Sequence, residues 1–535
     1  MKLHKSIAIT IGLVVGLSSC DSFLSHDPDD RTKITKPSEA AELTVSAYSD
    51  YSTVTLFEFR ADNVMDKGKI RKLSRHWSAE MYKYNEYVTS TSQDSPEGIW
   101  REYYKAIGHA NQALLDLSKM DQDDSSVKEA RGEALMCRSY ALYMLAQIFT
   151  VPYDPATAES QLGLPCPTLP ETHLLQDYER GTLKELYDVI VKDFEEGYSL
   201  VGDNYKSPKF HFTRQASAAF GTRLYRTLGN WDRVIELSND CLGTNPALYT
   251  RKINDKNSKY QGTYAEREQI WSYETEDCNF LLSVAFSYWT RVFASEKYGL
   301  TTQIMHYFSK KTKNGKYVGE NFLGVAPHIG FFGNASVVNI PKFFEHFEYT
   351  NVTQGTGYIH GQFVLLGGDE VLFNMAEAYV MKNQFERARD LLQLFVSNYM
   401  RDYDPSSDEY KVTEEKILTY YKDVLGNQVH PDRIHGIDIK DFNPFFETTT
   451  TQEAYLRACV DLKRMAFLEE GMRWMDNRQY RMDVVHNLVS DDGSSESYIV
   501  LRGDDPRYAV QIPENTRAYL EPNPGYENEL KPITK

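Results

Sequence analysis

Residues Leu224–Pro246, which read LYRTLGNWDRVIELSNDCLGTNP, decide how this chain folds. Two stretches with helical spacing of apolar residues flank the pair Gly229-Asn230, and glycine followed by asparagine permits a tight reversal of the chain. The small side chains of Val234 and Cys241 let neighbouring helices approach closely. Pro246 closes the second stretch, because proline cannot continue a helix. The sequence therefore predicts two antiparallel helices joined by a short turn.

A second, weaker copy of this pattern lies within residues 377–388. Both copies have residues at the offsets of a tetratricopeptide unit, namely Tyr225, Gly229, Trp231, Asp232, Val234, Ile235, Cys241, Leu242 and Pro246 in the first and Glu377, Ala378, Tyr379, Asn383, Phe385, Glu386 and Ala388 in the second. A long segment of different character separates them, so they do not form a simple tandem array. We expect a mainly α fold, with tetratricopeptide-like helical repeats as the scaffold.

Helical spacing also predicts helices over residues 100–114, 127–149, 183–200 and 452–470. Irregular stretches rich in aromatic, polar or proline residues lie between them, at 60–96, 255–364 and 403–450 and in the tail from 490. We expect these to be long irregular insertions with a few short strands. We expect the chain to divide into four parts: residues 1–19 (a signal segment), 20–37 (a polar tether), 38–250 (an N-terminal helical part) and 251–535 (a C-terminal part with aromatic-rich insertions).

The first twenty residues have the pattern of an export signal. Lys2 and Lys5 precede an uncharged apolar run from Ile7 to Leu17, and small residues lead to Cys20. A cysteine at this place resembles a bacterial lipobox, in which the thiol is acylated and becomes the new N-terminus. The alternatives are a transmembrane anchor, for which the run is too short, and an ordinary signal peptide with a chance cysteine. An acidic, polar stretch follows, from Asp21 to Asp30.

The overall composition describes a globular, acidic protein. The 535 residues are 41% hydrophobic and 25% charged, with a formal net charge of −17. This charge argues against general binding to nucleic acid, which requires basic patches. The other five cysteines are far apart and form no CxxC pair, which argues against a disulfide scaffold. Aromatic residues make up 13% of the chain, enough to fill a core and still build a stacking surface.

Motifs for catalysis or metal binding are missing from the sequence. It contains no G-x-S-x-G nucleophile turn, no phosphate loop and no H-E-x-x-H pattern. Acidic pairs such as Asp369-Glu370 have no surrounding pattern that favours a glycosidase. We therefore expect no enzyme activity, no catalytic residue, no metal and no cofactor.

Five stretches between Trp100 and Arg478, with Asn523-Pro524-Gly525-Tyr526 near the end, together resemble the SusD/RagB family of outer-membrane nutrient-binding lipoproteins of the Bacteroidota. The five are Trp100-x2-Tyr103-x3-Ile107-x3-Asn111, Gly132-Glu133-Ala134-x3-Arg138-x-Tyr140, Arg214–Asp232, Ala376-Glu377-Ala378-Tyr379, and Leu462–Arg478 with Glu470-Gly471-x-Arg473-Trp474-x-Asp476-x-Arg478.

The charged residues of these motifs have a structural interpretation. Arg138, Arg473 and Arg478 predict buried guanidinium–carboxylate pairs, with Glu133, Glu470 and Asp476 as nearby carboxylates. Trp474 is expected to be a core residue.

The resemblance implies a surface-exposed, lipid-anchored protein that binds an oligosaccharide or similar nutrient and covers a SusC-like TonB-dependent transporter of the outer membrane. Sugar rings stack on aromatic side chains, while polar side chains bond their hydroxyls in a concave site. Our candidates for glycan contact are the aromatic residues Trp77, Tyr82, Tyr84, Trp100, Trp289 and Tyr298, with Arg75 and Asn85 as hydrogen-bonding residues. Trp100 is alternatively only a helix-start residue. A different function is also open: a helical-repeat scaffold that binds partner proteins and has no ligand site of its own.

Overall fold

The computed structural model describes residues 36–534 apart from 72, 74, 88, 171–177, 294–295, 330–331, 335–336, 425–436, 438, 441, 491 and 494. The predicted signal, Cys20 and nearly all of the predicted tether lie outside the described residues. Within them, no helix combines the length and apolar character that crossing a bilayer requires.

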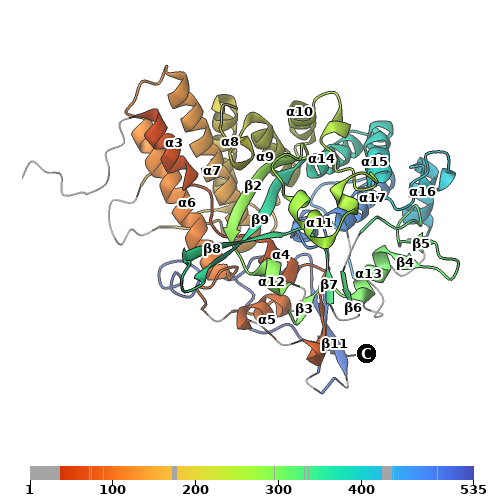
Figure 1. Ribbon diagram of the computed structural model, residues 1–535. Coiled ribbons are helices and arrows are strands. Elements are labelled where there is room, and N and C mark those ends of the chain that lie inside the picture. The colour runs from red at the N-terminus through yellow and green to blue at the C-terminus, as the bar shows by residue number, and fades with distance from the viewer. Residues whose placement is uncertain are drawn as a thin grey trace, which may run out of the picture.

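Helices dominate the structure and pack side by side in one array (Figure 1). Neighbours along the array are α6 with α7, α7 with α8, α9 with α10, α10 with α14, and α14 with α15 and α17. The two repeat units are therefore adjacent in space, because α10 of the first packs on α14 of the second. The bounds are α3 Pro37–Val45, α6 Pro96–Leu117, α7 Ser125–Phe149, α8 Leu183–Leu200, α9 Arg214–Thr227, α10 Trp231–Leu242, α14 Gly368–Met381, α15 Phe385–Tyr399, α17 Thr450–Ala466 and α18 Met472–Gln479.

The two repeat units form as their sequences predict. Gly229 has φ +71°, a left-handed conformation that suits glycine, and the Asn230 side chain caps α10 by accepting a hydrogen bond from the Arg233 backbone. In the second unit Asn383 takes the corresponding left-handed position with φ +59°, which asparagine tolerates better than most residues. Val234 and Cys241 are buried. The predicted mainly α fold with tetratricopeptide-like units is confirmed.

Short strands and helices occupy the predicted insertions. The described residues form two antiparallel sheets of three strands each, in the orders β2-β9-β8 and β10-β11-β12, and three further sheets of two strands. The strands are β1 Met65–Asp66, β2 Asn279–Phe286, β3 Tyr298–Gly299, β4 Lys310–Lys311, β5 Tyr317–Val318, β6 Phe332–Asn334, β7 Val337–Asn339, β8 Phe344–Asn351, β9 Thr356–Gly367, β10 Val484–Val489, β11 Glu496–Leu501 and β12 Ile533–Thr534. The short helices are α4 Val54–Arg60, α5 His76–Lys83, α11 Tyr264–Trp271, α12 Trp289–Val292, α13 Thr302–Phe308 and α16 Glu414–Leu418. Residues 60–96 thus contain α5 as well as loops.

Buried ion pairs join these elements, but their partners differ from the predicted ones. Arg138 pairs with Asp193 at 2.6 Å, and Arg473 pairs with Asp62 at 2.7 Å. Arg478 donates to the backbone oxygens of Ala146 and Tyr508 and to the side-chain oxygen of Gln147. The predicted carboxylates have other partners: Glu133 contacts Tyr48 and His211, Glu470 pairs with Lys342, and Asp476 pairs with Arg226 and Lys463. Trp474 is fully buried and stacks on Tyr508, as expected of a core residue.

The carboxyl of Glu58, on α4, gives the fold a dependence on pH. It is 1% exposed, accepts a hydrogen bond from the Gly471 backbone at 2.7 Å, and burial raises its pKa to about 7. A raised carboxyl pKa stabilises the fold below the unfolded value near 4.5, and this contribution is lost as the pH rises to about 7.

Glu58→Gln keeps the hydrogen-bond acceptor and removes the charge. As the pH rises from 5 to 8, we expect the free energy of unfolding of this variant to increase relative to that of the parent by up to a few kcal/mol. Denaturant unfolding at both pH values measures this gain. Glu266→Gln is the matched control, because hydrogen bonds from Thr263 lower the pKa of that exposed carboxyl. A stability difference for Glu58→Gln that does not change with pH would contradict the argument.

Candidate functional site

Five of the six aromatic residues predicted to contact a ligand lie in the core. Trp77, Tyr82, Tyr84, Trp289 and Tyr298 are each at most 3% exposed. Tyr82 is stacked between the rings of Tyr298 and His486, at 4.1 Å from each, so neither of its faces is open. Trp289 donates its indole N–H to the Glu469 carbonyl at 3.2 Å. Covered rings offer no face for a sugar. The burial of these five residues therefore contradicts the prediction that they contact a glycan.

The two predicted hydrogen-bonding residues are half-buried and engaged elsewhere. The Arg75 guanidinium lies 4.5 Å from the ring centre of Tyr288, and Asn85 donates to Glu529 at 3.3 Å. Neither of them lines the cavity described next.

A cavity of about 750 Å³ lies beside α6, and Trp100 is the predicted site residue that it contains. Among the described residues, it is lined by the exposed side of α6, the loop Pro165–Pro170, Tyr178 and the turn Asn515–Leu520. Its volume lies in the range of small-ligand sites. The lining residues are Trp100, Arg101, Tyr104, Lys105, Gly108, Asn111, Gln112, Pro165, Pro167, Leu169, Pro170, Tyr178, Asn515, Thr516, Tyr519 and Leu520.

The wall formed by α6 is an aromatic stripe at helical spacing. The Ser95 side chain caps the helix by accepting a hydrogen bond from the Gly98 backbone N–H, and Pro96 is the first residue of the helix. Trp100 and Tyr104 follow one turn apart with ring centres 4.8 Å apart, and Phe149 supports Trp100 edge-on. Gly108 comes one further turn along. A Cβ at Gly108 would meet no atom within 4 Å, so the helix backbone itself is open to the cavity.

A buried polar chain holds the loop wall in place. Arg138 makes a bidentate pair with Asp193 and donates to the Asn111 side-chain oxygen at 2.8 Å. Asn111 in turn donates its amide hydrogens to the carbonyls of Pro167 and Leu169. The position of the proline-rich loop therefore depends on charges in the helical core.

The third wall belongs to the C-terminal segment, which runs back beside the N-terminal helices (Figure 1). Asn523, from the motif near the end of the chain, donates to the carbonyls of Phe149 and Val510. Arg180 donates to Asn523 at 2.8 Å and to the Gly163 carbonyl, so one guanidinium connects two walls of the cavity. Tyr519 and Leu169 are large, exposed side chains on these walls, 72% and 69% exposed.

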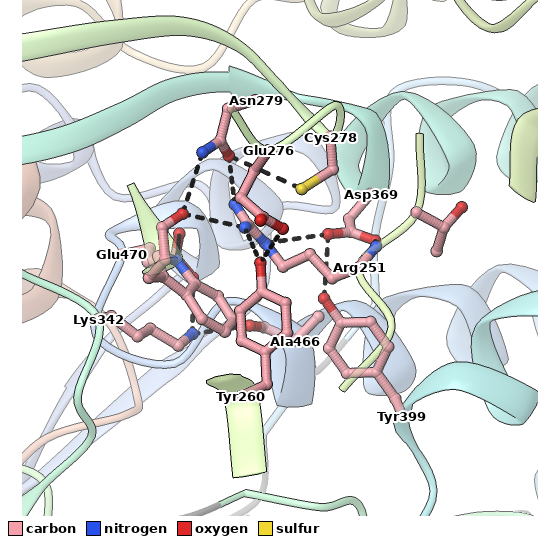
Figure 2. Close-up of polar contacts among 12 residues, drawn as sticks. Arg251, Tyr260, Glu276, Cys278, Asn279, Lys342, Asp369, Tyr399, Ala466 and Glu470 are labelled. Atoms are coloured by element: carbon pink, nitrogen blue, oxygen red, sulfur yellow. Dashed lines mark hydrogen bonds and ion pairs between the residues drawn. The ribbon is translucent and has the colours of Figure 1, made fainter. Parts of the chain in front are cut away.

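Another charged cluster lies where β2 and α14 begin, at Asn279 and Asp369, and has the features of a structural centre (Figure 2). Arg251 contacts Asp369, Asn279 and Tyr260, and Lys342 donates to Glu470 and to the carbonyls of Ala466 and Leu468. The Trp271 ring lies between the two cations, within 4.4 Å of each. Because these donors have partners within the protein, the cluster joins elements together and offers little to a ligand.

The cavity lining supplies aromatic rings, side-chain amides and two cations. Among the described residues, its lining includes no carboxylate, thiol or imidazole. The described residues also contain no group of three histidine, cysteine or acidic side chains placed to hold a metal ion. Sequence reasoning missed Tyr104, Tyr178 and Tyr519 as site residues. The one-turn spacing of Trp100, Tyr104 and Gly108 is the signal that was available for the first of these.

The comparisons with known proteins agree with this architecture. Residues 22–226 match a SusD-like family model described as starch-binding and associating with the outer membrane. SusD-like protein P2 of Formosa agariphila is 24% identical over 226 residues, which span 42% of this chain and 40% of the relative's length.

Solved structures share the fold over most of the chain. A SusD superfamily protein of Bacteroides thetaiotaomicron superposes with TM-score 0.59 at 15% identity, covering 92% of this chain and 100% of the other. A SusD-like carbohydrate binding protein of Bacteroides vulgatus superposes with TM-score 0.59 at 12% identity, covering 91% and 98%. Residues 22–226 thus resemble the SusD-like family, and nearly the whole chain shares the fold of solved SusD superfamily structures.

Proposed function

We propose that this protein is a surface lipoprotein that binds a glycan in the cavity beside α6 and delivers it, unreacted, to a SusC-like TonB-dependent transporter of the outer membrane. The observation that carries the proposal is a cavity of about 750 Å³ lined by aromatic rings and polar side chains. Aromatic faces and a few placed polar groups are what a saccharide site requires. The carbohydrate-binding description of the structural relative from Bacteroides vulgatus supports the same ligand class.

A lipid on Cys20 would hold the protein at the membrane. One acyl chain gives only marginal binding, so a lasting attachment requires more than one. We expect Cys20→Ala to release the protein into the soluble fraction, as measured by immunoblotting of separated membranes. Retention of this variant at wild-type levels would contradict the lipobox interpretation.

Binding is tested with a panel of oligosaccharides and a variant that leaves the core intact. Tyr519→Ala removes an exposed ring from the mouth of the cavity and is expected to weaken binding about tenfold or more, on the scale of 1–3 kcal/mol per stacked ring. Calorimetric titration of each binding glycan measures this loss. Tyr349→Ala, which removes a 57%-exposed ring from β8 outside the cavity, is the matched control. Equal losses in both variants would place the site elsewhere.

The alternative is a helical-repeat scaffold without its own ligand, which the array of repeat units favours. A scaffold would bind no member of the panel and would still associate with the transporter when both are purified. Glycan binding that Tyr519→Ala weakens separates the two functions.

A further inference from the structure

The charge of the cavity lining is opposite to that of the whole protein. Arg101 and Lys105 lie in the lining, and no described lining residue is aspartate or glutamate. The full chain, by contrast, has 76 acidic and 59 basic residues. The lining thus presents two cations, and the carboxylates that they contact, Glu102 and Asp50, lie outside it.

Both cations stand one helical turn apart on α6, each next to a ring of the aromatic stripe. Arg101 follows Trp100, and Lys105 follows Tyr104. Residues at this spacing share a helix face. A ligand whose ring stacks on the stripe would have its charged substituents within reach of the two cations.

Glu102, which is more buried than the two cations, contacts both of them. Its carboxylate oxygens lie 3.2 Å from Arg101 Nε and 2.9 Å from Lys105 Nζ, and its side chain is only 12% exposed against 47% and 51% for the cations. The hydrogen bond to Glu102 raises the pKa of Lys105, so this amine stays charged. Arg101 donates one of its five guanidinium N–H groups to Glu102 and another to the Tyr51 hydroxyl.

The remaining interactions of these cations are weak enough to yield to a ligand. The 3.4 Å pair of Lys105 with Asp50 is about half exposed on both sides, and such pairs contribute about 0–1 kcal/mol. A carboxylate or sulfate on the ligand would form charge-assisted hydrogen bonds with an arginine fork in geometry that neutral hydroxyls cannot match.

We propose that the cavity selects anionic saccharides, those with carboxylate or sulfate groups, through Arg101 and Lys105. This specificity rests on the proposed glycan binding in the same cavity. Neutral glycans would stack on the same rings and lack the charged contacts.

The experiment titrates the full-length protein with short uronate and sulfated oligosaccharides, each paired with its carboxyl-reduced or desulfated form. We expect every anionic saccharide that binds to do so about tenfold or more tightly than its neutral partner, since one charge-assisted contact of about 1.4 kcal/mol gives that factor. Its affinity is expected to fall with added salt, whereas that of the neutral form is not. The uronate and sulfate arms show which anion the site takes.

The double variant Arg101→Gln/Lys105→Gln is expected to lose the preference and bind both members of a pair alike. Lys184→Gln is the matched control, since Lys184 is an exposed lysine in an ion pair with Asp188 on α8, outside the cavity. Neutral forms that bind as tightly as anionic ones, with the Tyr519 dependence preserved, would overturn the anionic preference and leave glycan binding standing. Failure of every paired saccharide to bind would overturn both.

Discussion

Gly108→Trp is expected to abolish ligand binding, with at least a hundredfold loss of affinity, and to leave the fold intact. Gly108 lies in the middle of α6, and its Cβ position is empty to 4 Å. An indole placed there extends into the cavity beside Trp100 and Tyr104 and occupies the volume that a ligand needs. Because no core atom is displaced, the thermal midpoint should stay within a few degrees of the parent.

Gly108→Ala is the control for this substitution. Alanine adds one methyl group, so binding should persist. Its stability should rise by about 0.5–1 kcal/mol, because glycine in a helix interior is less favourable than alanine by this amount. Calorimetric titration and thermal unfolding of the two variants measure both effects. Wild-type affinity in Gly108→Trp would show that the ligand does not use this cavity.

Arg226→Met is expected to lower the free energy of unfolding by about 3–5 kcal/mol, the usual cost of leaving buried charges without their partner. Arg226 is 3% exposed and lies 2.7 Å from Glu377 and 2.8 Å from Asp476. Burial alone would lower the pKa of this arginine, but the two carboxylates raise it, so the guanidinium stays charged. It links α9 of the first repeat unit to α14 of the second and to α18.

Denaturant unfolding measures this loss of stability. Two further variants test whether it arises from buried charges left without a partner. Arg226→Met combined with Glu377→Gln should recover part of the loss, because fewer buried charges then lack a partner. Arg233→Met removes an arginine from the neighbouring helix, where the partner Glu195 is 42% exposed, and should cost about 1 kcal/mol or less. Equal costs for Arg226→Met and Arg233→Met would contradict the role of burial.

The sequence predicted those parts of the structure that local signals encode. Gly229-Asn230 and Asn383 mark turns because few residues tolerate their backbone conformations, and the apolar spacing of residues 183–200 predicts α8 with its observed bounds. It could not predict which carboxylate meets Arg138, because Asp193 comes from a separate helix and only tertiary packing brings it within 2.6 Å.

The candidate site was less predictable for the same reason. Trp77 and Trp289 lie in irregular segments that have no periodicity to distinguish a core ring from a surface ring, and both are buried. Trp100, for which the sequence left open a ligand contact or only a helix-start residue, lies on α6 in the cavity lining. The rest of the cavity comes from segments beginning near residues 165 and 515. No local sequence pattern predicts that these two segments pack beside α6.

Asn523 and the turn before it have a consequence for biogenesis. The cavity closes only when residues 515–520 return to α6 and Asn523 engages Phe149 and Arg180. A polypeptide interrupted before this segment during synthesis or export would still contain every helix of the array and yet lack one side of its binding cavity. Formation of the complete cavity thus depends on residues 515–523, which come hundreds of residues after α6.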